Sequence, residues 1–202
     1  MQVLEDIGVN EINIFLLLVG VNMLIGLTGR NASGKSTLVD WFSKKGMKSF
    51  SCSDSIRTWL REHNKEITRD ALIEGGRELR RQGGGGILAD MLIKIIDGED
   101  AVIDSIRTPA EVFSLKSRGD FVLIEVKASE EMRWARLQSR ARPGDPIDKQ
   151  IFLEQENKEA KAKDAAGQDL DATAEMSDFE IINDGSVENL HNKLEDLWEK
   201  IS

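Results

Sequence analysis

The sequence predicts an α/β fold in which a parallel β-sheet is covered by helices on both faces. Three observations carry this prediction. Short apolar runs alternate along the chain with longer helical patterns, as they do in consecutive βαβ units. The runs at 23–28, 101–104 and 121–126 are largely apolar, which is typical of strands buried on both faces. Residues 29–37 match the pattern G-x-x-x-x-G-K-[ST] directly after the first of these runs.

The segment GRNASGKST has the spacing and the flanks of a phosphate-binding loop, with a strand-like run before it and a helical pattern after it. Its glycines let backbone N–H groups turn inward around an anion, and the helix N-terminus adds its dipole. Lys35 is expected to reach the terminal phosphates of a nucleoside triphosphate, and Ser36 to offer a hydroxyl to Mg²⁺. An unliganded strand-to-helix turn is the alternative. The predicted phosphate-binding residues are Gly29, Arg30, Asn31, Ala32, Ser33, Gly34, Lys35, Ser36 and Thr37.

Composition narrows the class of protein further. A length of 202 residues suits one domain, and a hydrophobic content of 40% is enough for a core. The net charge of −9 argues against general binding to nucleic acid or to a membrane surface. Cys52 is the only cysteine, so the chain has no internal disulfide and no Cys-based zinc site. We therefore expect a cytoplasmic protein.

Two interpretations compete for the apolar stretch near the N-terminus. Residues 14–27 resemble a membrane segment, but acidic residues precede them where a signal peptide has basic ones. A membrane span of about 20 residues would also consume the strand that feeds the phosphate loop. We therefore predict no membrane segment, and we treat residues 1–22 as an extension of unknown role ahead of a domain at 23–202.

The remaining elements follow in order. Thr108, Pro109 and Glu111 form a capping-box signature that starts a helix. Four consecutive glycines, 83–86, break a helical region and suggest either a flexible connection or a hinge that approaches a ligand. The polar segment 148–177 suggests a solvated helix and then a loosely held stretch around 165–173. Further strands are expected at 47–52 and 179–182, and further helices at 53–63, from 68, and at 87–96, 129–140 and 186–201.

Arginines placed after the predicted strands indicate a second half of the site. Catalysis of phosphoryl transfer is mostly positioning and charge stabilisation by cations. The candidate segments are Asp54-Ser55-Ile56-Arg57, Asp104-Ser105-Ile106-Arg107 and the arginines that follow the fourth strand, Arg133, Arg136, Arg140 and Arg142. Helical spacing puts Arg133, Arg136 and Arg140 on one stripe, either as a solvated face or as a face toward polyphosphate, and the phosphate loop favours the second.

Together these segments resemble the P-loop nucleoside monophosphate kinases. Residues 54–57 match the D-x-x-R acceptor motif, residues 104–108 its D-G-x-P-R-T segment, and Arg136, Arg140 and Arg142 its lid arginines. Residues 182–185 are also similar to a turn beside the donor adenine in dephospho-coenzyme A kinases. The resemblance covers about 23–200. It implies a three-layer P-loop kinase fold with a parallel sheet, a helical acceptor-binding region at 53–97 and a short lid at 140–150.

The resemblance also implies substrates and roles. ATP would be the donor, Mg²⁺ would be held by Ser36 and Asp104, and the acceptor would be a phosphorylated small molecule. The implied catalytic residues are Lys35, Arg107, Arg136 and Arg140, the acceptor-binding residues are Asp54, Arg57, Arg80 and Arg107, and the adenine-side residues are Arg140, Asn183, Asp184 and Gly185.

Two departures from the family pattern keep several functions open. Ser105 and Ile106 replace a Gly and a Pro, and residues 148–160 contain no arginine. The acceptor is expected to be a (deoxy)nucleoside monophosphate, with dephospho-coenzyme A as the next candidate. A slow or non-catalytic ATP-binding regulatory module is the alternative from another class, and a membrane ATPase is a remote third. Asp54 also has an ordinary alternative role as a helix cap.

Overall fold

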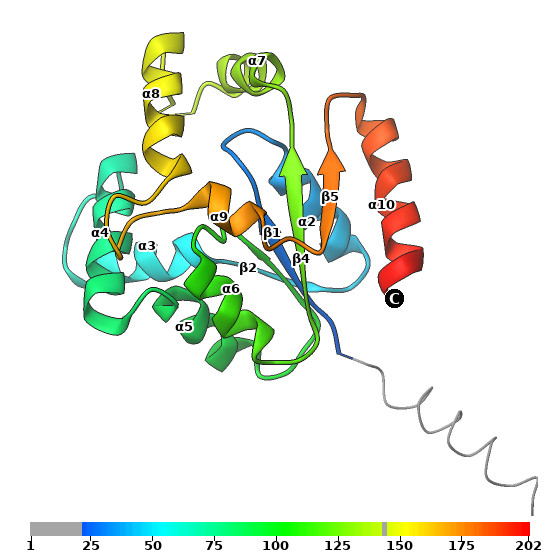
Figure 1. Cartoon of the computed structure of the whole chain (residues 1–202), viewed down its shortest axis with the longest axis horizontal. Helices are drawn as coiled ribbons and strands as arrows, with labels where there is room; N and C mark the ends of the chain where they lie inside the picture. Colours follow the sequence, from blue (N-terminus) through cyan, green and yellow to red (C-terminus); the bar gives the residue numbers. More distant parts are fainter. Residues whose placement is uncertain (1–21, 143–144) are drawn as a thin grey trace, which may run out of the picture.

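The computed structural model describes residues 22–142 and 145–202, which form a five-stranded sheet with helices on both faces (Figure 1). All neighbouring strands are parallel, and their order is β2-β3-β1-β4-β5. The predicted three-layer α/β fold is confirmed. The strands are β1 (Leu24–Thr28), β2 (Lys48–Ser51), β3 (Ala101–Asp104), β4 (Phe121–Lys127) and β5 (Phe179–Ile182).

The strand order determines where on the sheet a ligand site is expected. The chain leaves central β1 toward β2 and β3 on one side and then crosses to β4 and β5 on the other. Parallel sheets of this kind leave a crevice at the carboxyl ends of their strands, at the point where the order reverses. The phosphate loop, which follows β1, and Asp104, the last residue of β3, meet there.

Successive strand residues point to opposite faces, and each face has its own core. Leu24 packs in one core and Ile25 in the other. The first core is covered by α3 (Cys52–Glu62), α4 (Arg69–Gly83), α5 (Ile87–Ile96) and α6 (Pro109–Lys116), and the second by α2 (Lys35–Lys44) and α10 (Val187–Ile201). Beyond the carboxyl ends of the strands lie α7 (Glu130–Arg140) and α8 (Lys149–Ala160), and α9 (Leu170–Ala174) follows α8 (Figure 1).

The capping signature predicted at Thr108 is confirmed. Its side chain accepts a hydrogen bond from the Glu111 N–H, the Glu111 carboxylate accepts from the Thr108 N–H, and Pro109 is the first helical residue. Ser186 likewise caps α10 at its predicted start, accepting from the Asn189 N–H. These local patterns need only a few neighbouring residues, which is why the sequence reveals them.

Strand β1 decides between the two interpretations of the apolar stretch near the N-terminus, a membrane segment or a strand that leads into the phosphate loop. Residues 24–28 form the buried central strand, so they do not belong to a membrane segment. Within residues 22–142 and 145–202, none of the helices has the length and apolar character needed to cross a bilayer. The predicted extension, apart from Asn22, lies outside the described residues.

The helix predicted within 148–177 is confirmed as α8, but the predictions that it is solvated and that a loosely held stretch follows it are wrong. The side chains of Phe152, Glu156, Glu159 and Ala160 are buried in α8, at the spacing of an inward-facing helical stripe. The polar composition hides this stripe because two of its members are carboxylates, and both pair with arginines. The stretch at 165–173 is also anchored, since Ala166, Leu170 and Thr173 are buried.

The glycine run is neither a loose connection nor a close approach to a ligand. Helix α4 continues through Gly83, Gly84 has a φ of +88°, and Gly85 and Gly86 pack against α6. A Cβ on Gly86 would lie 2.3 Å from the Ser114 Oγ, and one on Gly85 would lie 2.9 Å from the Ala110 Cβ. The run therefore lets α5 and α6 pack closely, and the Gly85 carbonyl accepts a hydrogen bond of 3.2 Å from the Thr108 hydroxyl.

Ser105 occupies the position where the resembling family has glycine, and its backbone φ of +66° lies in the left-handed region. Replacing it with glycine is expected to raise the free energy of unfolding by about 0.5–1 kcal/mol. Relief of the steric penalty outweighs the added chain entropy of glycine. Denaturant unfolding measures this change. Ser117→Gly is the control, because the φ of Ser117 is −64° and glycine relieves no strain there; it costs chain entropy and the 2.6 Å bond from the Ser117 hydroxyl to the Ser114 carbonyl. A comparable loss of stability in both variants would contradict the explanation.

Candidate functional site

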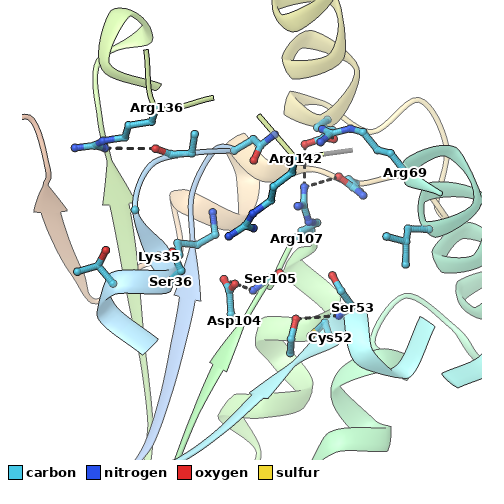
Figure 2. A pocket seen from close by; sticks show the side chains of 18 of the residues that line it. Lys35, Ser36, Cys52, Ser53, Arg69, Asp104, Ser105, Arg107, Arg136 and Arg142 are labelled. Carbon is cyan, nitrogen blue, oxygen red and sulfur yellow. Dashed lines mark hydrogen bonds and ion pairs between the residues drawn. The ribbon is translucent and has the colours of Figure 1, made fainter. Parts of the chain in front are cut away.

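One cavity of about 680 Å³ opens at the carboxyl ends of the central strands (Figure 2). It joins the phosphate loop to the segment after β3, to helices α3, α4 and α7, and to the turn after β5. It therefore brings together most of the residues predicted from distant parts of the sequence. Those that line it are Asn31, Ala32, Gly34, Lys35, Ser36, Thr37, Arg57, Arg80, Asp104, Arg107, Arg136, Arg140, Asn183 and Gly185.

The phosphate loop adopts a conformation that requires its glycines. The φ angles of Gly29 and Gly34 are +129° and +104°, in the region that side chains disfavour. A Cβ on Gly34 would lie 2.1 Å from the Asn183 Nδ2, and one on Gly29 would lie 2.3 Å from the Val126 carbonyl oxygen. No side chain caps the N-terminus of α2, so its first N–H groups face the cavity as an anion site.

Lys35 is the cation of this loop, and Figure 2 shows it pointing into the cavity. Its Nζ donates to the carbonyl oxygens of Gly29, at 2.6 Å, and Arg30, at 3.0 Å. Burial lowers the pKa of Lys35 to about 8, an effect that Asp104 opposes and Arg107 reinforces. A phosphate in the cavity would favour the charged form, because its negative charge compensates for the solvation that the ammonium loses on burial.

This pKa predicts a pH dependence for ATP binding. Protonated Lys35 is the form that attracts phosphate, so affinity is expected to hold below pH 8 and to fall as the pH rises through about 8. Calorimetric titration between pH 7 and pH 9 measures this. Lys35→Arg is the matched control, since arginine stays charged throughout the range. An equal pH dependence in both proteins would show that another group, such as ATP itself, causes the change.

The donor set beside Lys35 fits a magnesium ion that arrives with a nucleotide. The Ser36 hydroxyl and the Asp104 carboxylate both line the cavity, and Mg²⁺ prefers such oxygen ligands. The Asp104 Oδ1 accepts a 2.6 Å hydrogen bond from the Ser105 N–H, which fixes the carboxylate. Within the described residues, no three or more His, Cys, Asp or Glu side chains cluster around a metal-sized space. Phosphate oxygens and water would therefore complete the shell.

Two arginines of α7, Arg136 and Arg140, contact the phosphate loop. Arg136 donates to the Asn183 carbonyl at 2.8 Å and to the Ser33 carbonyl at 3.2 Å, so it ties the phosphate loop to the turn after β5. Arg140 donates to the Asn31 Oδ1 at 3.1 Å and forms two 2.8 Å bonds with Asp145. Arg142, in the next segment, points into the cavity (Figure 2).

The expectation that Arg133 shares this cavity-facing stripe is wrong. Its guanidinium is buried and pairs with Glu156 at 2.6 Å. It also donates to the Ala128 carbonyl, and it does not line the main cavity. Arginines with helical spacing can therefore have different environments. Helix α8 supplies an acidic partner for Arg133, whereas Arg136 and Arg140 contact the phosphate loop.

On the acceptor side, Arg107 is held by residues that no sequence motif singles out. Its Nη1 donates to the Glu159 Oε2 at 2.9 Å and to the Gln168 Oε1 at 3.0 Å, and the other Glu159 oxygen accepts from Arg69 at 2.6 Å. Burial opposes ionisation of Glu159, but Arg107 and Arg69 outweigh it and hold the pKa of the carboxyl below its ordinary value. The signal available in the sequence was a carboxylate inside the apolar stripe of α8, since a buried carboxylate needs a cationic partner.

Three other predicted residues have structural partners. Arg80 lines the cavity, but its guanidinium is buried and donates to the Glu111 Oε1 at 2.8 Å. Asp54 lies outside the cavity, exposed, with a 2.8 Å ion pair to Arg57. Asp184 also lies outside it, because its carboxylate accepts from the N–H of Ser129, the N-cap of α7. The structure thus does not bring Asp54 and Asp184 to the cavity.

A phosphate loop between a parallel strand and a helix, with arginines across the cavity, defines a P-loop protein of the kinase architecture. The chain belongs to the AAA domain family, whose model matches residues 25–164. It is similar to a UPF0200 protein of Thermococcus onnurineus, at 28% identity over 187 residues covering 89% of this chain and 98% of the relative. It is also similar to a UPF0200 protein of Methanocaldococcus jannaschii, at 26% identity over 184 residues covering 89% and 90%.

Solved structures give the same fold. Shikimate kinase from Bacteroides thetaiotaomicron matches with a TM-score of 0.59 at 16% identity, covering 88% of this chain and 98% of that one. TT1252 from Thermus thermophilus matches with a TM-score of 0.59 at 18% identity, covering 90% and 98%. At these identities the likeness shows the P-loop kinase fold, and the substrate has to be argued from the site.

Proposed function

We propose that this protein is an ATP-dependent, cytoplasmic kinase of a phosphorylated small molecule, with a (deoxy)nucleoside monophosphate as its acceptor. One observation carries the proposal: a single cavity is lined by the phosphate loop and also by three further cations, Arg57, Arg69 and Arg107, from α3, α4 and the segment after β3. A nucleotide hydrolase needs the first set alone, whereas transfer to a charged acceptor needs both.

At the donor end, each residue has a role that its position supports. The N–H groups at the start of α2 and the Lys35 Nζ bind the terminal phosphates of ATP. Ser36 and Asp104 hold Mg²⁺, which neutralises charge on the transferring group when bound. Arg136 and Arg140 already contact the loop and are placed to stabilise charge on it. Asn183, Gly185 and Val187 line the same end, where the adenine would lie.

The acceptor end combines an apolar wall with cations. Ile56, Leu72 and Leu88 line it and offer a surface on which a base can pack. Arg57 and Arg107 also line the cavity, and either can pair with the acceptor phosphate. Lys35 and Arg107 both line the cavity and could together position the acceptor phosphate beside the transferring group. No general base is required, because the attacking oxygen of such an acceptor is already an anion.

A second candidate from another class has its own support. Glu159 already pairs with Arg107 and Arg69, as an acceptor phosphate would. If an acceptor cannot displace this carboxylate, the chain is a slow or non-catalytic ATP-binding regulatory module. Within the kinase class, dephospho-coenzyme A is the next candidate acceptor. The turn at 182–185, which resembles that of dephospho-coenzyme A kinases, lies beside the phosphate loop, because the Asn183 Nδ2 donates to the Ser33 carbonyl at 2.8 Å.

The test is ADP release measured with a panel of nucleoside monophosphates and dephospho-coenzyme A. We expect one acceptor to raise the rate, and Arg107→Ala to raise the KM for that acceptor about tenfold to a hundredfold. Arg118→Ala is the matched control, because Arg118 pairs with Asp120 and does not line the cavity. A slow ADP release that no acceptor changes would favour the regulatory module and contradict the kinase.

A further inference from the structure

A second cavity, of about 280 Å³, lies between α4, α8 and the segment 161–168. It shares Arg69, Ile73, Glu159 and Gln168 with the acceptor end of the main cavity, so the two cavities have a common wall. Ligand pockets usually measure about 300–1,000 Å³, and this one is smaller. It therefore suits an end group of a ligand that extends from the main cavity better than a separate molecule.

The charge of this second cavity indicates an anion. Four cationic side chains line it, against two carboxylates, in a chain whose net charge is −9. Arg69 and Arg77 are engaged by Glu159 and Asp164. Lys158 and Lys163 form no ion pair within residues 22–142 and 145–202, so both ammonium groups are available to a ligand.

Arg69, in the shared wall, gives a second and independent observation. Its Nη2 is bonded to Glu159, but its buried Nε has no hydrogen-bond partner among the described residues. Buried polar groups are rarely left unpaired, and such a group in a ligand cavity is readily explained by an acceptor atom of the ligand. The Nε itself is shielded, but the Arg69 side chain is 25% exposed, so its guanidinium can turn toward a phosphate oxygen in the second cavity, which would give the Nε the acceptor that it lacks.

We propose that the acceptor carries a second phosphate, which the second cavity binds through Arg69, Lys158 and Lys163. The inference rests on the proposed function and narrows its substrate class from a monophosphate to an acceptor with two separated phosphates. One phosphate faces Lys35 and Arg107, and the sugar or an equivalent spacer passes the wall formed by Arg69 and Glu159. Ile73, which lines both cavities, supports the apolar part of that spacer.

The experiment compares two ligands by calorimetry: the nucleoside 5′-monophosphate with the highest turnover in the panel above, and its 3′,5′-bisphosphate. We expect the wild-type protein to bind the bisphosphate at least about tenfold more tightly. Lys158→Ala/Lys163→Ala should reduce that ratio to near one while the monophosphate affinity stays unchanged. The matched control is Lys44→Ala/Lys94→Ala, which removes two exposed lysines that line neither cavity.

The outcomes separate this inference from the proposal beneath it. Equal affinities for the two ligands in the wild-type protein overturn the second phosphate and leave the kinase intact. An equal loss of both affinities in Lys158→Ala/Lys163→Ala, or the same loss in the control variant, also overturns it. Failure of every acceptor to bind or to stimulate turnover, with ATP binding retained, overturns the proposed function itself.

Discussion

Phosphoryl transfer is expected to fall at least about a thousandfold when Lys35 is replaced by methionine. The Nζ is bonded to two carbonyl oxygens of the phosphate loop, and in the proposed function it stabilises charge on the transferring group. The fold should survive, since removal of a buried ammonium with a lowered pKa also removes a desolvation cost. Steady-state kinetics and denaturant unfolding together measure the two effects.

Lys44→Met is the matched control for this prediction. Lys44 ends the same helix, α2, but is exposed and lies outside the cavity. Its replacement should leave kcat/KM within about twofold, as expected for a surface substitution without a specific partner. If Lys35→Met retained more than about a tenth of the wild-type rate, the loop would not stabilise the transferring phosphate as described.

Replacing Arg80 with methionine is expected to lower the free energy of unfolding by about 3–5 kcal/mol. The side chains of Arg80 and Glu111 are only 2% and 0% exposed, so the substitution leaves a buried carboxylate without its cation. Glu111 also accepts hydrogen bonds from the N–H groups of Arg107, at 2.8 Å, and Thr108, at 3.2 Å. Loss of Arg80 therefore also loosens the backbone that carries Arg107.

Two further variants make this prediction specific, and denaturant unfolding compares them. Arg80→Met/Glu111→Gln should regain most of the stability, because glutamine keeps an acceptor for the capping box without a buried charge. Arg81→Met should change stability by less than about 1 kcal/mol, since Arg81 is 48% exposed and its ion pairs lie on the surface. Equal losses for Arg80→Met and Arg81→Met would contradict the role assigned to the buried pair.

The parts of this protein that could be predicted are local in the sequence. The phosphate loop places its glycines and Lys35 within nine residues, between a strand and a helix that each have their own pattern. The capping box at Thr108 needs four residues. The alternation of strands and helices then fixes the layers, because parallel strands require helical crossovers. The sheet and the donor end of the cavity follow from such patterns.

The acceptor end was harder to predict because distant segments build it. Glu159 meets Arg107 across 52 residues and Arg69 across 90, and no local pattern encodes either pair. Arg133 and Arg136 differ for the same reason. They are three residues apart on α7, yet only Arg133 meets the acidic side chain that α8 presents. Helical spacing gives the face of a residue but not the partner that the opposing helix offers.

The most direct test of the account is the fate of the γ-phosphate of ATP labelled with a radioactive isotope. The label is expected to move to the acceptor that stimulates ADP release, and Lys35→Met and Arg107→Ala should both prevent the transfer. Label found only in inorganic phosphate, at a rate that no acceptor changes, would contradict it.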